Sequence, residues 1–229
     1  MKKNTRKHNY IKKMVLVAVF TALAYVVALV IRFPVPPFLT LDLKDAVIAI
    51  GGMACGPISA VLITAYVALL EFISVGDTGV YGLIMDIISS VGFALTASLV
   101  YKYRKTFSGA IVALCSAVAV MTAMMLVANL VITPYYMGVS VEAVKGLIPT
   151  LLLPFNFLKA LLNAGVVALL YKPLTGALSG VLGKEKVRKK EIHLKTVLLI
   201  VVSVLLITVS LLILFLAMGA GVDFGFLEF

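Results

Sequence analysis

Motifs for catalysis and for metal binding are missing from this sequence. It has no tryptophan, two cysteines and two histidines. Cys55 and Cys115 lie in apolar runs without CxxC spacing, and neither His8 nor His193 has a nearby ligand partner. The signatures HExxH, GxSxG, Walker A and GxGxxG after a strand are also absent. We therefore expect no disulfide, no metal site and no enzyme activity of its own.

Charged residues are scarce as well, at 13% of the chain, whereas 62% of the residues are hydrophobic. Long apolar runs cover residues 14–31, 46–75, 83–101, 109–133, 155–171 and 196–218. Several reach the roughly 20 residues that cross about 30 Å of hydrocarbon. The basic start could pass for the beginning of a signal peptide, but the run after it is too long and has no cleavage site before Arg32. The sequence predicts an all-α integral membrane protein that keeps its first helix.

The net charge of +10 would suggest nucleic acid as a partner in a soluble protein, but here the basic residues lie between the spans. The run 46–75 is either one very long helix or two short ones broken at Gly56-Pro57, where a break costs little. With the break, three basic clusters fall on one side of the membrane, at 2–13, 102–105 and 172–195. We predict the break, seven helices, a cytoplasmic N-terminus and no nucleic-acid partner.

Polar residues from three spans then meet near the outer face. Asp86 lies in the first turns of the span that begins near residue 83, and Asn129 in the last turns of the next span, before Thr133-Pro134. In the following span, which we expect to begin near Pro154, Asn156, Lys159 and Asn163 share one helical face. Ionisable groups cost about 2.5–3.5 kcal/mol in a span, so they usually face the bundle interior and often mark a functional site. This convergence predicts a binding site.

Each of these residues also has a purely structural interpretation. Lys159 could extend its ammonium group to the membrane interface. Asn156 and Asn163 could hydrogen-bond neighbouring helices. Asp86 could be satisfied by a serine or by Lys159. Glu71 is expected at a solvated rim, outside the site.

Two small-residue seams run along the first helix. Ala18 and Ala22 are four residues apart, and Ala24 and Ala28 repeat that spacing. Small residues at this spacing let another helix approach closely. Either seam could pack inside the chain or dock on a partner subunit.

Three segments combine apolar runs with polar residues: FPVPPFLTLDLKDAVIAIGGMACGP, NLVITPYYMG and LLLPFNFLKALLNAGVVALLYKPL. Together they resemble the riboflavin-specific substrate-binding subunits, or S-components, of energy-coupling factor (ECF) transporters, and the resemblance covers residues 12 to about 173. It implies six spans, an outward-facing vitamin pocket, and docking on a transmembrane coupling protein with two ABC-type ATPases. No catalysis occurs in the S-component under that scheme.

The resemblance also assigns roles to residues. Ala18 and Ala22 match the alanine element that packs on the coupling protein. Asn129, Asn156 and Lys159 match positions that contact the flavin. The loop that covers the ligand corresponds to Phe38, Leu39 and Thr40.

Other site residues follow from position. Asp86 and Asn163 belong to the polar stripes, and Tyr135 and Tyr136 offer aromatic surface next to the site. The chain departs from the family in the segment VYGLIMD, where Leu83 takes the place of the family glutamate and Asp86 that of an asparagine.

Five regions are predicted along the chain. They are a basic cytoplasmic N-terminus (1–13), a six-helix substrate-binding domain (14–173), a basic linker (174–195), an additional C-terminal transmembrane helix (196–218) and an extracellular tail (219–229). The linker could bind anionic lipid heads. The expected function is capture of riboflavin for import across the bacterial cell membrane, with no cofactor. An S-component for thiamine or biotin, a membrane enzyme and an assembly factor are the alternatives.

Overall fold

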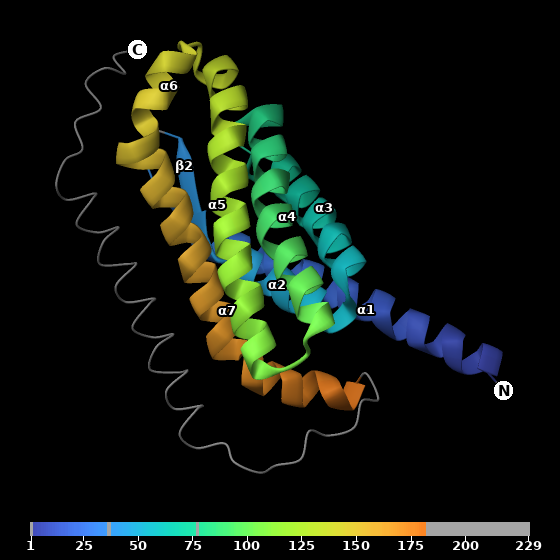
Figure 1. The fold of residues 1–229 in the computed structure, drawn as a ribbon. Helices are drawn as coiled ribbons and strands as arrows, with labels where there is room; N and C mark the ends of the chain where they lie inside the picture. The colour runs from blue at the N-terminus through green and yellow to red at the C-terminus, as the bar shows by residue number, and fades with distance from the viewer. Residues whose placement is uncertain (1, 36–37, 77, 182–229) are drawn as a thin grey trace.

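The molecule is a bundle of long helices with a small β-hairpin packed into it (Figure 1). The computed structural model describes residues 2–35, 38–76 and 78–181, and the side chains of 10–171 within those ranges. The elements, in chain order, are α1 (Lys2–Val30), β1 (Arg32–Val35), β2 (Leu39–Asp42), α2 (Lys44–Cys55), α3 (Pro57–Ser74), α4 (Gly79–Tyr103), α5 (Phe107–Met137), α6 (Val141–Leu147), the π-helical turn η1 (Ile148–Leu152) and α7 (Leu153–Val181).

The predicted break between two helices at Gly56-Pro57 is confirmed. α2 ends at Cys55 and α3 begins at Pro57, with Gly56 between them at a φ of 109°. Glycine tolerates this left-handed backbone, and proline suits a first helical position. With 12 residues, α2 is about 18 Å long and too short to cross the membrane alone.

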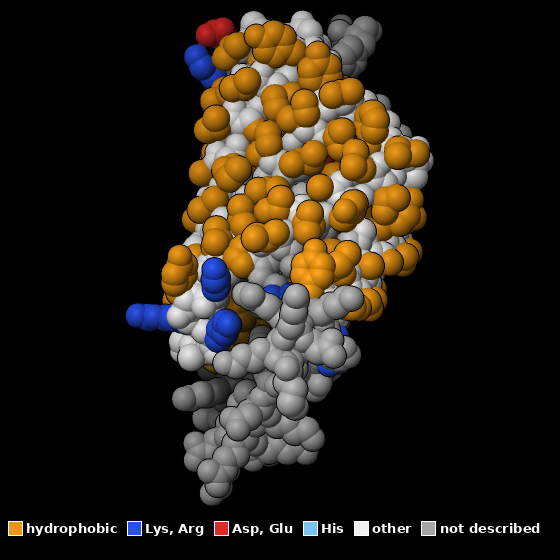
Figure 2. Space-filling view, turned by 90° about the vertical axis from the view of Figure 1, so that its right-hand side faces the viewer, with side chains coloured by type: hydrophobic (Ala, Val, Ile, Leu, Met, Phe, Trp, Pro, Cys, Tyr) orange, Lys and Arg blue, Asp and Glu red, His pale blue; other side chains and the backbone are white. Residues whose placement is uncertain are grey.

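Five helical stretches are long and apolar enough to cross a membrane: Tyr10–Val30, Pro57–Ser74, Gly79–Tyr103, Phe107–Met137 and Val141–Tyr171. Figure 2 shows the broad band of hydrophobic side chains that such a protein presents to lipid, with Lys and Arg side chains gathered at its lower edge. The prediction of a multi-spanning α-helical membrane protein is therefore confirmed for the described part of the chain, to which the structure adds one β-hairpin. The rest of the predicted linker, the additional helix at 196–218 and the tail lie outside the described residues.

One expected helix end is wrong, and one expected span is longer than predicted. α5 does not stop before Pro134 but continues through it to Met137, where Gly138 ends it in the left-handed conformation. A proline this close to a helix end disturbs only the last turn. α7 begins at Leu153, as expected for a helix that starts near Pro154, but α6 and η1 precede it without a break, so the apolar helical stretch begins at Val141.

The two alanine seams of α1 are used differently. Ala24 and Ala28 are buried, at 0% and 1% exposure, and α1 packs on α2 and α3. Ala18 and Ala22 are exposed. Internal packing is therefore the role of the Ala24–Ala28 seam, and the Ala18–Ala22 seam is left on the surface.

The hairpin joins α1 to α2. β1 and β2 are antiparallel, with Arg32 opposite Asp42 and Val35 opposite Leu39. Val35, Leu39 and Leu41 are buried against a cluster of side chains from α6, η1 and α7. This packing holds β2 beside the start of α7.

Candidate functional site

A cavity of about 460 Å³ opens at the hairpin end of the bundle. Its walls come from the hairpin, the end of α3, the start of α4, the end of α5 and the start of α7. The lining residues include Phe38, Leu39, Thr40, Asp42, Lys44, Glu71, Asp86, Ser89, Thr133, Tyr136, Asn156 and Lys159. Small-molecule sites commonly have about 300–1,000 Å³ of space and such mixed walls.

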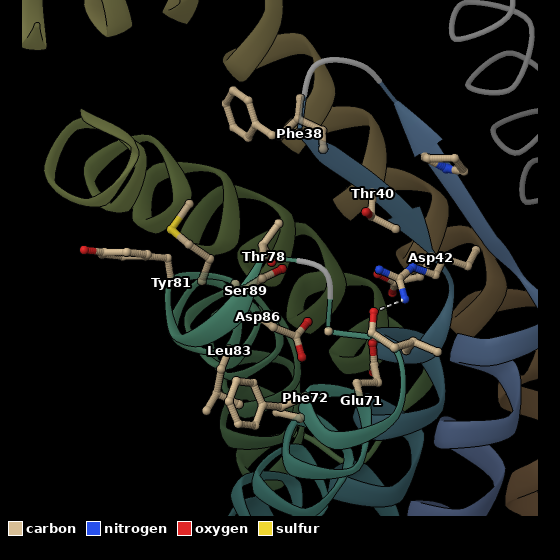
Figure 3. A pocket seen from close by; sticks show the side chains of 18 of the residues that line it. Phe38, Thr40, Asp42, Glu71, Phe72, Thr78, Tyr81, Leu83, Asp86 and Ser89 are labelled. Carbon is tan, nitrogen blue, oxygen red and sulfur yellow. Dashed lines mark hydrogen bonds between the residues drawn. The ribbon is translucent and has the colours of Figure 1, made fainter. Parts of the chain in front are cut away.

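Lys44 is the central cation of the cavity. It is the first residue of α2 and is 1% exposed. Its Nζ atom lies 2.5 Å from Glu71 Oε1 on α3 and 2.6 Å from Asp86 Oδ1 on α4. Figure 3 shows Glu71 and Asp86 reaching into the same space from neighbouring helices. One buried ammonium group therefore ties three helices together at the cavity wall.

A second ion pair joins the hairpin to α7. Lys159 Nζ lies 2.8 Å from Asp42 Oδ2, and both residues are buried, at 7% and 5% exposure. Burial disfavours the ionised carboxyl, but the Lys159 and Lys44 ammonium groups outweigh it and hold the pKa of Asp42 below its usual range. Lys159 does not extend to a membrane interface, so that alternative is excluded.

Asn163 fixes the start of α2 behind this pair. Its Oδ1 atom accepts from the Ala46 backbone N–H at 2.8 Å, and its Nδ2 atom donates to the Asp42 carbonyl at 3.1 Å. Asp45 is also fully buried, and its Oδ1 accepts from Ser90 Oγ at 2.5 Å. These bonds position Asp42 and Lys44, which lie on either side of the strand-to-helix turn.

Two buried oxygen atoms in the cavity lining have no hydrogen-bond partner among the described residues. They are Asp42 Oδ1 and Ser89 Oγ. Buried polar atoms are rarely left unpaired in native proteins.

Aromatic rings lie near the mouth of the cavity. The ring of Phe38 in the hairpin connection meets that of Tyr136 edge-on, with centroids 6.3 Å apart, and Tyr81 lies 6.2 Å from Tyr136. The cavity therefore combines flat apolar surface with paired charges, and it suits a planar ligand with a polar edge.

The structure brings together seven of the ten predicted binding residues in the cavity lining: Phe38, Leu39, Thr40, Asp86, Tyr136, Asn156 and Lys159. The other three are not among the lining residues. Asn129 is fully buried and bonds Met125 O and Thr133 Oγ1, Asn163 forms the bonds described above, and Tyr135 is 76% exposed. Both hydrogen-bond partners of Asn129, Met125 and Thr133, do line the cavity.

Two expectations about charge are corrected. Glu71 does not occupy a solvated rim, since its side chain is 17% exposed and is held by Lys44. Asp86 pairs with Lys44 and not with Lys159, because α2 inserts its first residue between α3 and α4. Lys44 and Asp42 were not predicted as site residues, although both stand out as charges in the segment FPVPPFLTLDLKDAVIAIGGMACGP.

A second, larger hollow lies between α1, α2 and α3. We call it the α1–α3 groove, and it has a volume of about 1360 Å³. Ala18 and Ala22 both line it, and so do four lysines. The predicted docking seam is therefore an accessible surface that is separate from the first cavity, with which the groove shares no lining residue.

No group of three or more potential metal ligands occurs among the described residues. The first cavity instead offers donors and acceptors that are already held in place. It can bind and orient a small molecule.

Comparisons with known proteins agree with this kind of site. Residues 12–174 match the family described as ECF transporter, substrate-specific component. The riboflavin transporter RibU of Staphylococcus aureus is 28% identical over 177 residues, which cover 73% of this chain and 92% of that protein. The riboflavin transporter FmnP of Bacillus subtilis is 28% identical over 173 residues, which cover 70% and 90%. A solved structure of the S component of a bacterial ECF transporter superposes with a TM-score of 0.63 at 25% identity, and the match covers 74% of this chain and 98% of that one.

Proposed function

The chain belongs to the substrate-specific components of ECF transporters, and we propose that it captures riboflavin at the outer face of the cell membrane for import. It is a multi-pass protein of that membrane and docks on an energising ECF module. Riboflavin is the transported ligand in this proposal and not a cofactor. The chain itself catalyses no reaction.

The observation that carries the proposal is the composition of the first cavity. Riboflavin has a flat tricyclic ring, a uracil-like edge with alternating donors and acceptors, and a hydroxylated ribityl tail. Phe38 and Tyr136 supply aromatic surface, and Asn156 and Lys159 supply amide and ammonium groups at the same cavity. Both relatives reported above are named riboflavin transporters. The first cavity can therefore contact both the flat ring of riboflavin and its polar edge.

In the proposed complex, Asn156 and Lys159 bind the ring edge or the tail, and Asp86 accepts a hydrogen bond beside them. Leu39 and Thr40 in β2 cover the ligand together with Phe38. Asn129 and Asn163 act one layer away from the ligand, because neither is among the residues that line the cavity.

Docking on the energising module uses a different surface from ligand binding. We propose that the Ala18–Ala22 seam packs on a transmembrane coupling protein that carries two ABC-type ATPases, and that the N-terminus is cytoplasmic. Both alanines are exposed and lie in the α1–α3 groove, away from the first cavity. Docking can therefore occur while the ligand stays bound.

The test is identification of the ligand that co-purifies with the full chain. Protein purified from cells grown with riboflavin should show flavin absorbance and release riboflavin, measured by mass spectrometry. Titrations with thiamine and biotin serve as controls on the same preparation. Release of another vitamin, or tighter binding of thiamine or biotin than of riboflavin, would refute the proposed substrate.

A further inference from the structure

The α1–α3 groove has a strongly uneven charge. Four lysines line it, from the first half of α1 and from the end of α4 with the turn that follows: Lys12, Lys13, Lys102 and Lys105. No Asp or Glu occurs among the described residues that line it. Figure 2 shows Lys and Arg side chains at the lower edge of the hydrophobic band. This positive end attracts an anion.

The rest of the groove is apolar and elongated. Ile58, Leu62, Tyr66, Leu69 and Ile73 of α3 line it at steps of three or four residues, so they form one continuous stripe. Their exposed fractions range from 43% to 80%. The stripe is about 22 Å long at 1.5 Å per residue, which exceeds the depth of one leaflet, roughly half of 30 Å of hydrocarbon.

Small residues create the hollow beside this stripe. Ala18 and Ala22 on α1 and Gly52 and Ala54 on α2 line the groove without filling it. Water would find few partners along these walls, whereas a hydrocarbon chain would bury apolar surface against them.

We propose that the α1–α3 groove binds one anionic phospholipid, with its phosphate among the four lysines and its acyl chains along α3. Charge and shape together select this ligand, because the basic end lies at the edge of the apolar band and the stripe runs from there into the membrane. The lipid would cover the Ala18–Ala22 seam, so it has to leave before any partner helix packs there. The site does not depend on which vitamin the first cavity binds.

The experiment is a lipid titration of the delipidated full chain, followed by native mass spectrometry. The probes are palmitoyl-oleoyl-phosphatidylglycerol and palmitoyl-oleoyl-phosphatidylcholine, which share acyl chains and differ in charge. We expect one phosphatidylglycerol to bind in preference to phosphatidylcholine. Replacing two lysines by K102Q/K105Q should weaken phosphatidylglycerol binding by about tenfold or more, because each basic side chain near a lipid surface contributes separately.

Two control variants locate the site. Lys145→Gln removes an exposed lysine, paired with Glu142 at 3.4 Å on α6, and should change binding by less than about twofold. Ala18→Leu narrows the apolar part without changing charge and should weaken binding of both lipids. Riboflavin binding by these variants reports separately on the fold and on the proposed function.

Three results would overturn the inference. Equal binding of the two lipids would mean that the lysines select no charged headgroup. A loss with Lys145→Gln as large as with K102Q/K105Q would indicate general charge attraction. Displacement of phosphatidylglycerol by glycerol phosphate at equal concentration would show that the apolar stripe contributes nothing, and would leave the groove to a protein partner alone.

Discussion

Replacing Lys44 by methionine tests the charge arrangement of the first cavity. Methionine keeps most of the side-chain length but removes the ammonium group between Glu71 and Asp86, 2.5 and 2.6 Å from their oxygens. The Lys44 side chain is 2% exposed, whereas those of Glu71 and Asp86 are 17% and 21% exposed. The variant therefore leaves two carboxylates close together without their cation.

The expected cost follows from that burial. Removing one partner of a buried ion pair destabilises proteins by about 3–5 kcal/mol, and the partial exposure of both carboxylates favours the lower end. About 3 kcal/mol corresponds to a decrease in Tm of about 6–12 °C for a domain of this size. The triple variant Lys44→Met, Glu71→Gln, Asp86→Asn should recover much of this stability, because the two carboxylates that pair with Lys44 are then replaced by neutral amides.

The chain provides its own reporter for this measurement. Cys55 is buried and Cys115 is exposed, so a Cys115→Ser background leaves one thiol that a maleimide dye labels when the protein unfolds. Lys145→Met is the matched control, since its pair with Glu142 is exposed and should contribute less than about 1 kcal/mol. If Lys44→Met is no less stable than this control, or the triple variant no more stable than Lys44→Met, the buried cation does not hold the bundle together.

Three further predictions concern binding, topology and coupling. Lys159→Ala should weaken riboflavin binding about tenfold or more in a flavin-fluorescence titration, because hydrogen bonds to charged groups contribute about 1.5–3 kcal/mol; binding within about twofold of wild type contradicts a ligand contact. Lys105→Cys should react with an impermeant maleimide only from the cytoplasmic side, and labelling from outside would reverse the proposed orientation. Ala18→Leu combined with Ala22→Leu should leave riboflavin binding intact and abolish uptake in cells. Ala24→Leu is the contrasting change and should destabilise the fold, because Ala24 is 0% exposed. If uptake survives the double change, the Ala18–Ala22 seam does not dock on the coupling protein.

The sequence by itself predicted the membrane class and the segments that form the bundle. Length and apolarity determine a span, and the weak helix propensity of Gly56-Pro57 determines a break. These are local properties, so no knowledge of neighbouring helices was required. The helical repeat also placed Asn156 and Lys159 on one face of α7, and both line the cavity.

Only the tertiary structure determined which face of each helix points into the bundle. Periodicity relates residues within one helix but does not fix its rotation about its own axis relative to its neighbours. For this reason Asn163 bonds the backbone of α2 although it shares a stripe with Lys159, and Asn129 bonds within α5. The same rotation buries Ala24 and leaves Ala18 exposed.

The sequence also could not predict which buried charges form ion pairs with one another. Opposite charges attract over a few ångströms in space, whatever their separation along the chain. Lys44 binds a residue 27 positions away on α3, and Lys159 binds one 117 positions away in β2. The short helix α2 brings Lys44 between α3 and α4, and the packing of the hairpin on α7 brings Asp42 to Lys159. The sequence therefore determined which charges lie in the membrane domain, and the packing of α2 and the hairpin determined how they pair.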